Sequence, residues 1–347
     1  MKVDYIIVGC GLAGIAFCEQ LLANNKTFVV FDNNSQQSST VAGGLYNPVT
    51  LKRFTPVWLS KIQLDLALPM YSKIEKRLNV KLDYKIPVRR RFMSLVEQNN
   101  WFSRSDRVGL SDYMSLDIHK NTNQYINSEF GFGEVLKTGR IDTKLLVSEY
   151  RKDLSKENLL FRESIDYNEI QFQENAIAYK EIVANYIVFA EGFGIKDNPF
   201  FNTLPLEGSK GELVTIIAPN LKLDYVLKSS VFIIPLGHDI YRIGSTNERI
   251  VKDNVITTKA KEELVNKLKA IITCDFEVVD QVAGIRPTVR DRRPLVGKHS
   301  KHKNIAVLNG LGNRGVMIGP YVAQQLFNHI ENNSPLDNEL DIARFDN

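Results

Sequence analysis

Three glycines and an aspartate near the N-terminus have the spacing of a dinucleotide-binding motif. Gly9, Gly11 and Gly14 form GxGxxG directly after the apolar run Tyr5–Val8, and Asp32 follows about 20 residues later. In this motif the first glycine allows a tight turn, the second lets the backbone approach a pyrophosphate, and the third packs a helix against the strand. The acid accepts hydrogen bonds from ribose hydroxyls and disfavours the 2′-phosphate of NADP. The spacing therefore predicts a site for FAD or NAD, and a glycine-rich turn in another α/β unit is the alternative.

An arginine near the C-terminus is the second candidate for chemistry. Arg314 lies in the glycine-rich stretch NGLGNRG, and an amphipathic helix is predicted to follow at once. Glycines let the backbone approach a ligand closely, and a helix N-terminus attracts negative charge. Arg314 is therefore predicted to hold a substrate carboxylate, with a solvated surface residue as the alternative.

The remaining residue patterns indicate neither a catalytic triad nor a metal site. The sequence places no nucleophile or acid at catalytic spacing from His238 or His299, and the three cysteines, at positions 10, 18 and 274, show no CxxC or Cys/His spacing. This cysteine usage fits a reducing, cytoplasmic setting. The N-terminal apolar run is too short for a signal peptide, and the sequence nowhere reaches the roughly 18 apolar residues of a membrane span.

Composition is that of an ordinary globular protein with about two domains. The chain has 347 residues, of which 44% are hydrophobic and 24% charged, and its net charge is +4. Positive charge is concentrated in two runs, VRRRF at 88–92 and RDRRPLVGKHSKHK at 290–303. Such runs are usually solvated faces, and the alternative is a surface that guides a polyanion such as tRNA.

The elements that must position these residues follow from hydrophobic periodicity and capping signals. Helices are predicted at Leu12–Ala23, at Val57–Leu78 with a kink or break at Pro69, and from a cap at Asp142 to about Leu154. Strands are predicted, in chain order, at Tyr5–Val8, Phe28–Phe31, about Asp83–Leu95, Gly131–Lys137, Ile187–Ala190 and repeatedly between about 211 and 282.

The segment after Asp32 favours FAD over NAD. An NAD dehydrogenase usually continues with further βα repeats, whereas this chain continues with NNSQQSST and VAGGLYNPV. The hydroxyls of residues 38–40 can donate to phosphates, and the thin backbone at 42–44 suits a flat ring; a flexible surface loop is the alternative. A late parallel strand that returns after an antiparallel insertion is also typical of a flavoprotein.

In these features the chain resembles the D-amino-acid oxidase-like superfamily of FAD-dependent oxidoreductases along essentially its whole length. The matching segments, in order, are IIVGCGLAG with VVFD, AGGLYNPV, IVFAEGFG, FIIPLGHDIYRIGST, GIRPTVRDRRPLVG and NGLGNRGVMIGP. The last two are most similar to glycine oxidase-type amine oxidases, and also to the oxidase half of the bifunctional enzyme that makes 5-methylaminomethyl-2-thiouridine in tRNA. Glu191 departs from the family, which usually has a small or hydroxyl residue before this glycine.

The resemblance implies an α/β fold, α+β overall. It consists of a Rossmann-like FAD-binding domain at 1–82, 140–208 and 283–347, and a mainly antiparallel β substrate domain at 83–139 and 209–282. The cofactor is expected to be non-covalent FAD, contacted by Gly9, Gly11, Leu12, Ala13, Gly14, Asp32, Asn33, Thr40, Ala42, Gly43, Gly44, Leu45, Ile165, Ala190, Glu191, Gly192, Gly310, Gly312, Asn313, Arg314, Gly315 and Val316.

For the reaction, the resemblance implies oxidation of the C–N bond of a small amine or amino acid. Hydride transfer to the flavin is followed by imine hydrolysis, with oxygen or another acceptor taking the electrons. Arg286 in GIRPT and Arg314 are expected to hold the substrate carboxylate through paired hydrogen bonds. Tyr241 is either a third pocket residue or an ordinary strand tyrosine. The alternative functions are an oxidase of a modified tRNA uridine and a dehydrogenase that passes electrons to a quinone or protein.

Overall fold

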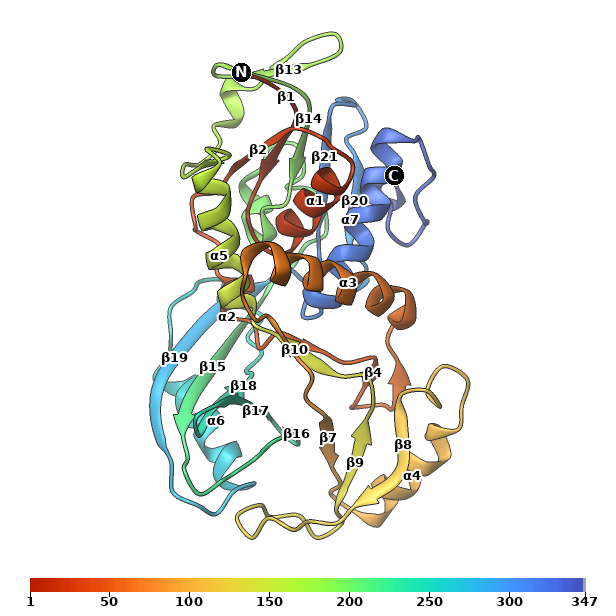
Figure 1. The fold of residues 1–347 in the computed structure, drawn as a ribbon, viewed down its shortest axis with the longest axis vertical. Helices are drawn as coiled ribbons and strands as arrows, with labels where there is room; N and C mark the ends of the chain where they lie inside the picture. Colours follow the sequence, from red (N-terminus) through yellow and green to blue (C-terminus); the bar gives the residue numbers. More distant parts are fainter. Residues whose placement is uncertain (346–347) are drawn as a thin grey trace.

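Two eight-stranded sheets lie toward opposite ends of the molecule, with helices between them (Figure 1). The computed structural model describes residues 1–345. A small three-stranded sheet lies between the two large ones and consists of β3 (Leu45–Tyr46), β10 (Gly139–Ile141) and β6 (Asp83–Tyr84). A further pair, β4 (Val49–Thr50) with β5 (Thr55–Pro56), follows β3 in the chain.

The first sheet has a parallel centre, as the buried apolar runs predict. Its central strands, in spatial order, are β11 (Leu160–Phe161), β2 (Phe28–Phe31), β1 (Lys2–Val8), β14 (Ile182–Phe189) and β21 (Ile305–Asn309). Antiparallel strands are added by β13 (Ile177–Tyr179), β12 (Gln171–Phe172) and β20 (Leu295–Lys298). Val8 pairs with both Phe31 and Phe189, so the carboxyl ends of three parallel strands meet at one edge.

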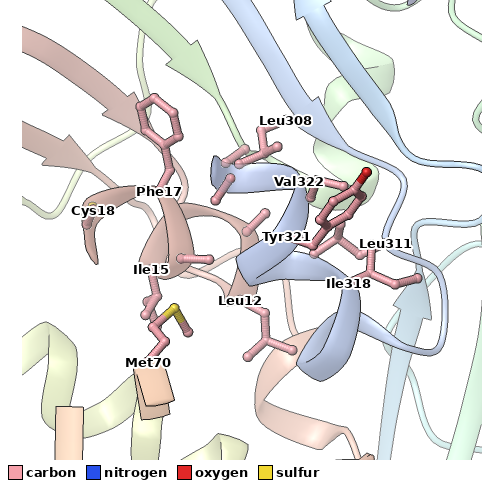
Figure 2. Packing of buried hydrophobic residues seen from close by; sticks show 14 of the residues in the cluster. Leu12, Ile15, Phe17, Cys18, Met70, Leu308, Leu311, Ile318, Tyr321 and Val322 are labelled. Carbon is pink, nitrogen blue, oxygen red and sulfur yellow. The ribbon is translucent and has the colours of Figure 1, made fainter. Parts of the chain in front are cut away.

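Helices α1 (Leu12–Ala23), α3 (Ser60–Leu78) and α7 (Gly315–Glu331) pack together through one apolar cluster. Figure 2 shows the α1 side chains Leu12 and Ile15 packed with Ile318 and Val322 of α7 and with Met70 of α3. The start of α7 approaches α1 closely, because a Cβ added at Gly315 would lie 3.1 Å from Leu12 Cδ1. The N-termini of the two helices are therefore neighbours.

The second sheet is antiparallel except between β16 and β7. Its strands, in spatial order, are β19 (Glu277–Arg286), β15 (Ser209–Ile217), β18 (Ile240–Gly244), β17 (Phe232–Gly237), β16 (Val226–Lys228), β7 (Val88–Arg91), β9 (Phe132–Val135) and β8 (Met114–His119). We call the face with Leu213, Phe232 and Ile234 the inner face, because Gly43 of the segment after β2 packs against Ile234 there. The opposite, outer face is covered by α6 (Thr258–Lys269).

Most predicted elements are confirmed. The helix at Leu12–Ala23 and the strand at Phe28–Phe31 have the predicted bounds. Asp142 caps α5 (Thr143–Lys156), since its Oδ1 accepts a hydrogen bond from the Leu145 amide at 3.1 Å.

Three predicted features are wrong in detail. Helix α3 begins at Ser60 instead of Val57, and of the kink or break predicted at Pro69 the break is not found. The predicted strand to Leu95 ends at Arg91, and α4 (Leu95–Ser105) begins after a Ser94 cap. The strand-rich region contains α6, which Thr257 caps. In both missed helices a side-chain hydroxyl accepts a hydrogen bond from a free amide of the first turn. In the prediction, the alternation of apolar residues outweighed this local helix signal.

Candidate functional site

The N-terminus of α1 is a compact backbone site without a side-chain cap. A Cβ at Gly9 would lie 2.5 Å from the Ala190 oxygen, and one at Gly14 would lie 1.9 Å from the Gly9 oxygen, so both positions require glycine. The Leu12 amide donates to Ser39 Oγ at 3.0 Å. Within residues 1–345 the amides of Ala13 and Gly14 have no acceptor, and they form a positive helix end suited to an anion.

Asp32 lies at the end of β2, where the sequence predicts a ribose-binding acid, and it is held from two sides. It accepts a hydrogen bond from the Cys10 amide and forms an ion pair with Arg151 of α5, whose Nη2 lies 3.0 and 3.1 Å from the two carboxylate oxygens. Arg151 Nη1 also donates to Asn34 at 2.6 Å. Sequence reasoning missed Arg151, because only the folded chain brings it to Asp32 across 119 positions.

The other predicted contacts around α1 lie at the same sheet edge but differ in what they do. Asn33 Nδ2 donates to Ser164 at 2.8 Å. The Thr40 hydroxyl donates to Gln37, so it is Ser39 that reaches α1. Ile165 is a buried member of the core cluster on the opposite side of the first sheet from α1.

The glycines that follow α2 (Ser38–Val41) are in close contact with their surroundings. A Cβ at Gly43 would lie 2.8 Å from Ile234 Cδ1, and one at Gly44 would lie 1.9 Å from the Ile141 oxygen. Thr143 Oγ1 donates to the Ala42 oxygen at 3.3 Å, and Leu45 begins β3. The segment therefore contacts the inner face of the second sheet and is not a free surface loop.

Glu191 follows β14, and its carboxyl group is held by side chains. It accepts hydrogen bonds from the Tyr167 hydroxyl at 2.6 Å and from Asn198 Nδ2 at 2.8 Å. Burial raises the pKa of Glu191 to about 7, although these two donors act in the opposite direction. Next to it, the Gly192 oxygen accepts a hydrogen bond from Asn309 at 2.9 Å, which ties this turn to β21.

The turn before α7 is a second backbone site. Gly310 and Gly312 have φ values of +75° and +59°, a region that glycine adopts without strain. Asn313 is exposed, and Arg314 is the N-cap residue. Within the described chain the amides of Gly315 and Val316 lack an acceptor, so this helix start, like that of α1, can stabilise negative charge.

The turn before α7 also contacts the segment that follows Arg286. The Gly312 amide donates to the Pro287 oxygen at 3.0 Å, directly after Arg286. Arg286 Nη2 donates to Ser245 Oγ at 2.6 Å, and Arg314 Nη1 donates to the Asn47 oxygen at 3.0 Å. Both side chains are half-buried, burial lowers the pKa of each, and neither forms an ion pair within residues 1–345. The solvated alternative therefore fits neither arginine.

Tyr241 lies on the outer face of the second sheet, away from these arginines. It is 3% exposed and belongs to the cluster under α6, and its hydroxyl accepts a hydrogen bond from the Leu223 amide at 3.2 Å. Strand parity places Tyr241 on the same face as Ile216 and opposite to Arg242. Its position supports the alternative of an ordinary strand tyrosine, so we leave it out of the site.

The first basic run is not the solvated face that its sequence predicts. Arg89 pairs with Glu134 at 2.8 Å and Arg90 with Glu97 at 2.5 Å, while Arg91 is buried and donates to Ser229 Oγ at 3.3 Å. In the second run, Arg293 pairs with Glu339 at 2.6 Å. The exposed residues of that run are Arg290, Asp291, Arg292, Ser300, Lys301 and Lys303.

The family profile described as "DAO: FAD dependent oxidoreductase" matches residues 4–328. The chain belongs to this family. Within the part of this FAD-dependent oxidoreductase that the structure describes, no helix is both long and apolar enough to span a membrane. The same residues contain no group of three or more His, Cys, Asp or Glu side chains that could hold a metal ion.

Individual relatives are more distant. A D-amino acid dehydrogenase of Helicobacter pylori is 28% identical over 194 residues, which are 52% of this chain and 46% of the relative. The match thus spans about half the length of that protein. Two solved structures share the fold: glycine oxidase from Bacillus cereus ATCC 14579 has a TM-score of 0.80 at 16% identity and 96% coverage of both chains. Glycine oxidase from Geobacillus kaustophilus also has a TM-score of 0.80 at 16% identity, and covers 99% of this chain and 98% of its own.

The two neighbouring helix starts fit the cofactor of a FAD-dependent oxidoreductase. Each carries unpaired amides, and each is approached by a thin backbone. A Cβ at Gly11 would lie 2.9 Å from Ser39 Oγ, so glycine keeps the space in front of the α1 amides open. Asp32 supplies the carboxylate that a ribose requires, and Arg151 holds that carboxylate in position.

Proposed function

We propose that this oxidoreductase oxidises the C–N bond of a small amino acid or amine, whose carboxylate binds to Arg286 and Arg314. The observation that carries the proposal is that the guanidinium groups of Arg286 and Arg314 are both half-buried and have no carboxylate partner in the described chain. Partly desolvated cations are unfavourable without a counter-ion, and a carboxylated substrate supplies one.

The proposal includes the location of FAD. The amides of Ala13 and Gly14 would hold its pyrophosphate, Asp32 its ribose, and Gly43 and the start of α7 would flank its ring system. We expect binding to be non-covalent, because the C-terminal segments GIRPTVRDRRPLVG and NGLGNRGVMIGP contain no cysteine. Bound FAD would supply a hydride acceptor for the substrate carbon next to nitrogen, and the resulting imine would take up water to give a carbonyl compound and ammonia or an amine.

The protein's own residues then serve mainly to orient the substrate. A guanidinium that holds both carboxylate oxygens fixes the plane of the carboxylate and the position of the α-carbon, which limits the directions that the α-carbon C–H bond can take. The unpaired amides of Gly315 and Val316, together with the dipole of α7, favour negative charge at this end of the site. The buried, uncrosslinked cysteines support a reducing, cytoplasmic setting for this chemistry.

A second candidate is a dehydrogenase that delivers electrons to an acceptor other than oxygen. The match to the D-amino acid dehydrogenase of Helicobacter pylori favours it. Action on tRNA has less support, because Arg89 and Arg90 are engaged in ion pairs within the protein.

The test is a panel of amino acids and amines added to the purified protein. We expect the protein to be yellow, and anaerobic addition of a carboxylated amine to bleach the flavin absorbance. Peroxide formed in air would identify an oxidase, whereas reduction of an added dye without peroxide would identify the dehydrogenase. If no amine or amino acid bleaches the flavin, the proposal is wrong.

A further inference from the structure

A guanidinium group without any partner lies on the inner face of the second sheet. Arg242 of β18 pairs across the strands with Ile234 of β17 and with Thr215 of β15, so the three side chains share that face. Arg242 is half-buried, and its side chain forms no hydrogen bond or ion pair within residues 1–345. Its Nε and the neighbouring Thr215 hydroxyl are both enclosed and unpaired. Because its terminal nitrogens are not enclosed, a ligand can reach them.

A second arginine approaches the same place from the small sheet. Arg140 of β10 is 8% exposed, and its Nε has no partner within the described chain. A Cβ at Gly44 would lie 3.4 Å from Arg140 Cγ, and one at Gly43 would lie 2.8 Å from Cδ1 of Ile234, the direct neighbour of Arg242. The two arginines therefore adjoin one turn, where the small sheet meets the second large sheet.

The charges around Arg242 leave its guanidinium group without a counter-ion in contact. Burial lowers the pKa of Arg242, and the charge of Arg140 acts in the same direction. Asp280 and Asp142 act in the opposite direction, but neither forms an ion pair with Arg242 in the described chain. Asp142 is engaged by Arg140 at 3.4 Å, and Asp280 lies on β19, two strands or roughly 10 Å from β18. A partly desolvated cation in this situation is stabilised by an anion.

We propose that the terminal nitrogens of Arg242 bind a small carboxylate ligand, and that the charge of Arg140 strengthens this binding. A guanidinium group presents parallel N–H donors that match the two oxygens of a planar carboxylate. The site is separate from that of Arg286, whose guanidinium covers Gly211, four residues before Thr215 on β15 and roughly 13 Å away along the strand. The inference therefore goes beyond the proposed function and does not rest on it.

The first experiment maps the site in the FAD-loaded wild-type protein. Phenylglyoxal, which modifies guanidinium groups, is applied with and without butyrate, and the modified residues are identified by mass spectrometry. We expect butyrate to slow the modification of Arg242 several-fold. The control is the exposed Arg162, which has no acidic partner in the described chain and should react equally fast in both samples. Equal modification of Arg242 with and without butyrate, or none in either sample, would overturn the proposal.

The second experiment separates this site from the one proposed for the substrate. Butyrate is titrated by calorimetry into a variant that carries Arg286→Met and Arg314→Met. We expect this variant to retain butyrate binding, and the further change Arg242→Gln to weaken it about ten- to a hundred-fold, as for one lost charge-assisted hydrogen bond. Arg162→Gln, added instead, should leave the affinity unchanged.

Two results of this titration would count against the site at Arg242. They are the absence of butyrate binding when Arg286 and Arg314 are replaced, and an affinity that Arg242→Gln leaves unchanged. If the wild type and the variant without both arginines bind butyrate equally, the carboxylate site of the proposed function fails and the site at Arg242 stands. Should the combined variant lose its flavin, the modification of the wild type decides the question alone.

Discussion

The starts of α1 and α7 are alike in their backbone and different in their side chains. Both have unpaired amides, and the two are neighbours through Leu12 and Gly315. Neither start has a side-chain cap or an acidic residue in its first turn. The start of α7 has Arg314 as its N-cap, which reaches across 267 positions to the Asn47 oxygen.

This difference indicates two ways of binding an anion. Near α1, amides and the helix dipole act alone, and they suit a pyrophosphate that must lie close to the backbone. Near α7, two guanidinium groups are added, and they suit a planar carboxylate that must be oriented as well as bound. Changes at α1 should therefore affect the cofactor, whereas changes at the arginines should affect the substrate.

The largest effect is expected from Gly11→Val. The added Cβ would lie 2.9 Å from Ser39 Oγ, and its branches would occupy the space in front of the α1 amides. We expect a folded protein without FAD, measured by the ratio of flavin to protein absorbance. Gly194→Ala is the control, because its Cβ meets only the flexible Gln36 side chain, at 3.2 Å. Retention of FAD by Gly11→Val would show that the pyrophosphate lies elsewhere.

Replacement of Arg286 or Arg314 by lysine should have an intermediate effect. Lysine keeps the charge but loses the bidentate fork. The loss of a charge-assisted hydrogen bond is worth about 1.5–3 kcal/mol, or roughly ten- to a hundred-fold in affinity for a carboxylated amine. The measurement is the substrate dependence of anaerobic flavin reduction. We expect the FAD spectrum to stay nearly intact, so loss of flavin in both variants would make these arginines structural.

A smaller effect is expected from Glu191→Gln, as a change in the pH dependence of stability. The folded pKa of about 7 exceeds the value of 4.5 for a free glutamate, so the folded state holds a proton that the unfolded state has lost. The stability from Glu191 is then complete below about pH 4.5 and is lost as pH rises through about 7. We expect the wild type to lose about 1–2 kcal/mol between pH 5 and pH 8 that Glu191→Gln, a neutral isostere, does not lose.

Thermal unfolding of both proteins at each pH measures this difference. Tyr167→Phe serves as the control, since it removes one hydrogen bond to the Glu191 carboxyl group and leaves the titrating group in place. Parallel pH profiles for wild type and Glu191→Gln would refute the assignment.

The smallest effect is expected at the exposed end of the second basic run. Lys301→Glu combined with Lys303→Glu changes exposed residues outside both helix starts, so we expect substrate affinity to change less than about twofold. Titration with tRNA at low and high salt completes the test. Saturable binding that weakens steeply with salt in the wild type and disappears in the double variant would favour the tRNA alternative.

The unit around the start of α1, where we propose that FAD binds, is largely readable from the sequence. Gly9, Gly11, Gly14 and Asp32 lie within one short strand–helix–strand unit, and its helix and second strand have their predicted bounds. The reason is that glycine conformation, apolar periodicity and the cap at Asp142 act between residues a few positions apart. Such local preferences need no knowledge of the rest of the fold.

Only the tertiary structure decided which side chains lie near the arginines that we propose bind the substrate. Alternation along β18 shows that Tyr241 and Arg242 lie on opposite faces, but not which face turns toward Gly43, because that depends on how the whole sheet packs. Arg151 meets Asp32 through a contact between residues 119 positions apart. Side-chain pairing of this kind arises from packing between elements. The sequence by itself therefore determined the GxGxxG unit with Asp32, and the tertiary structure decided which side chains lie beside it.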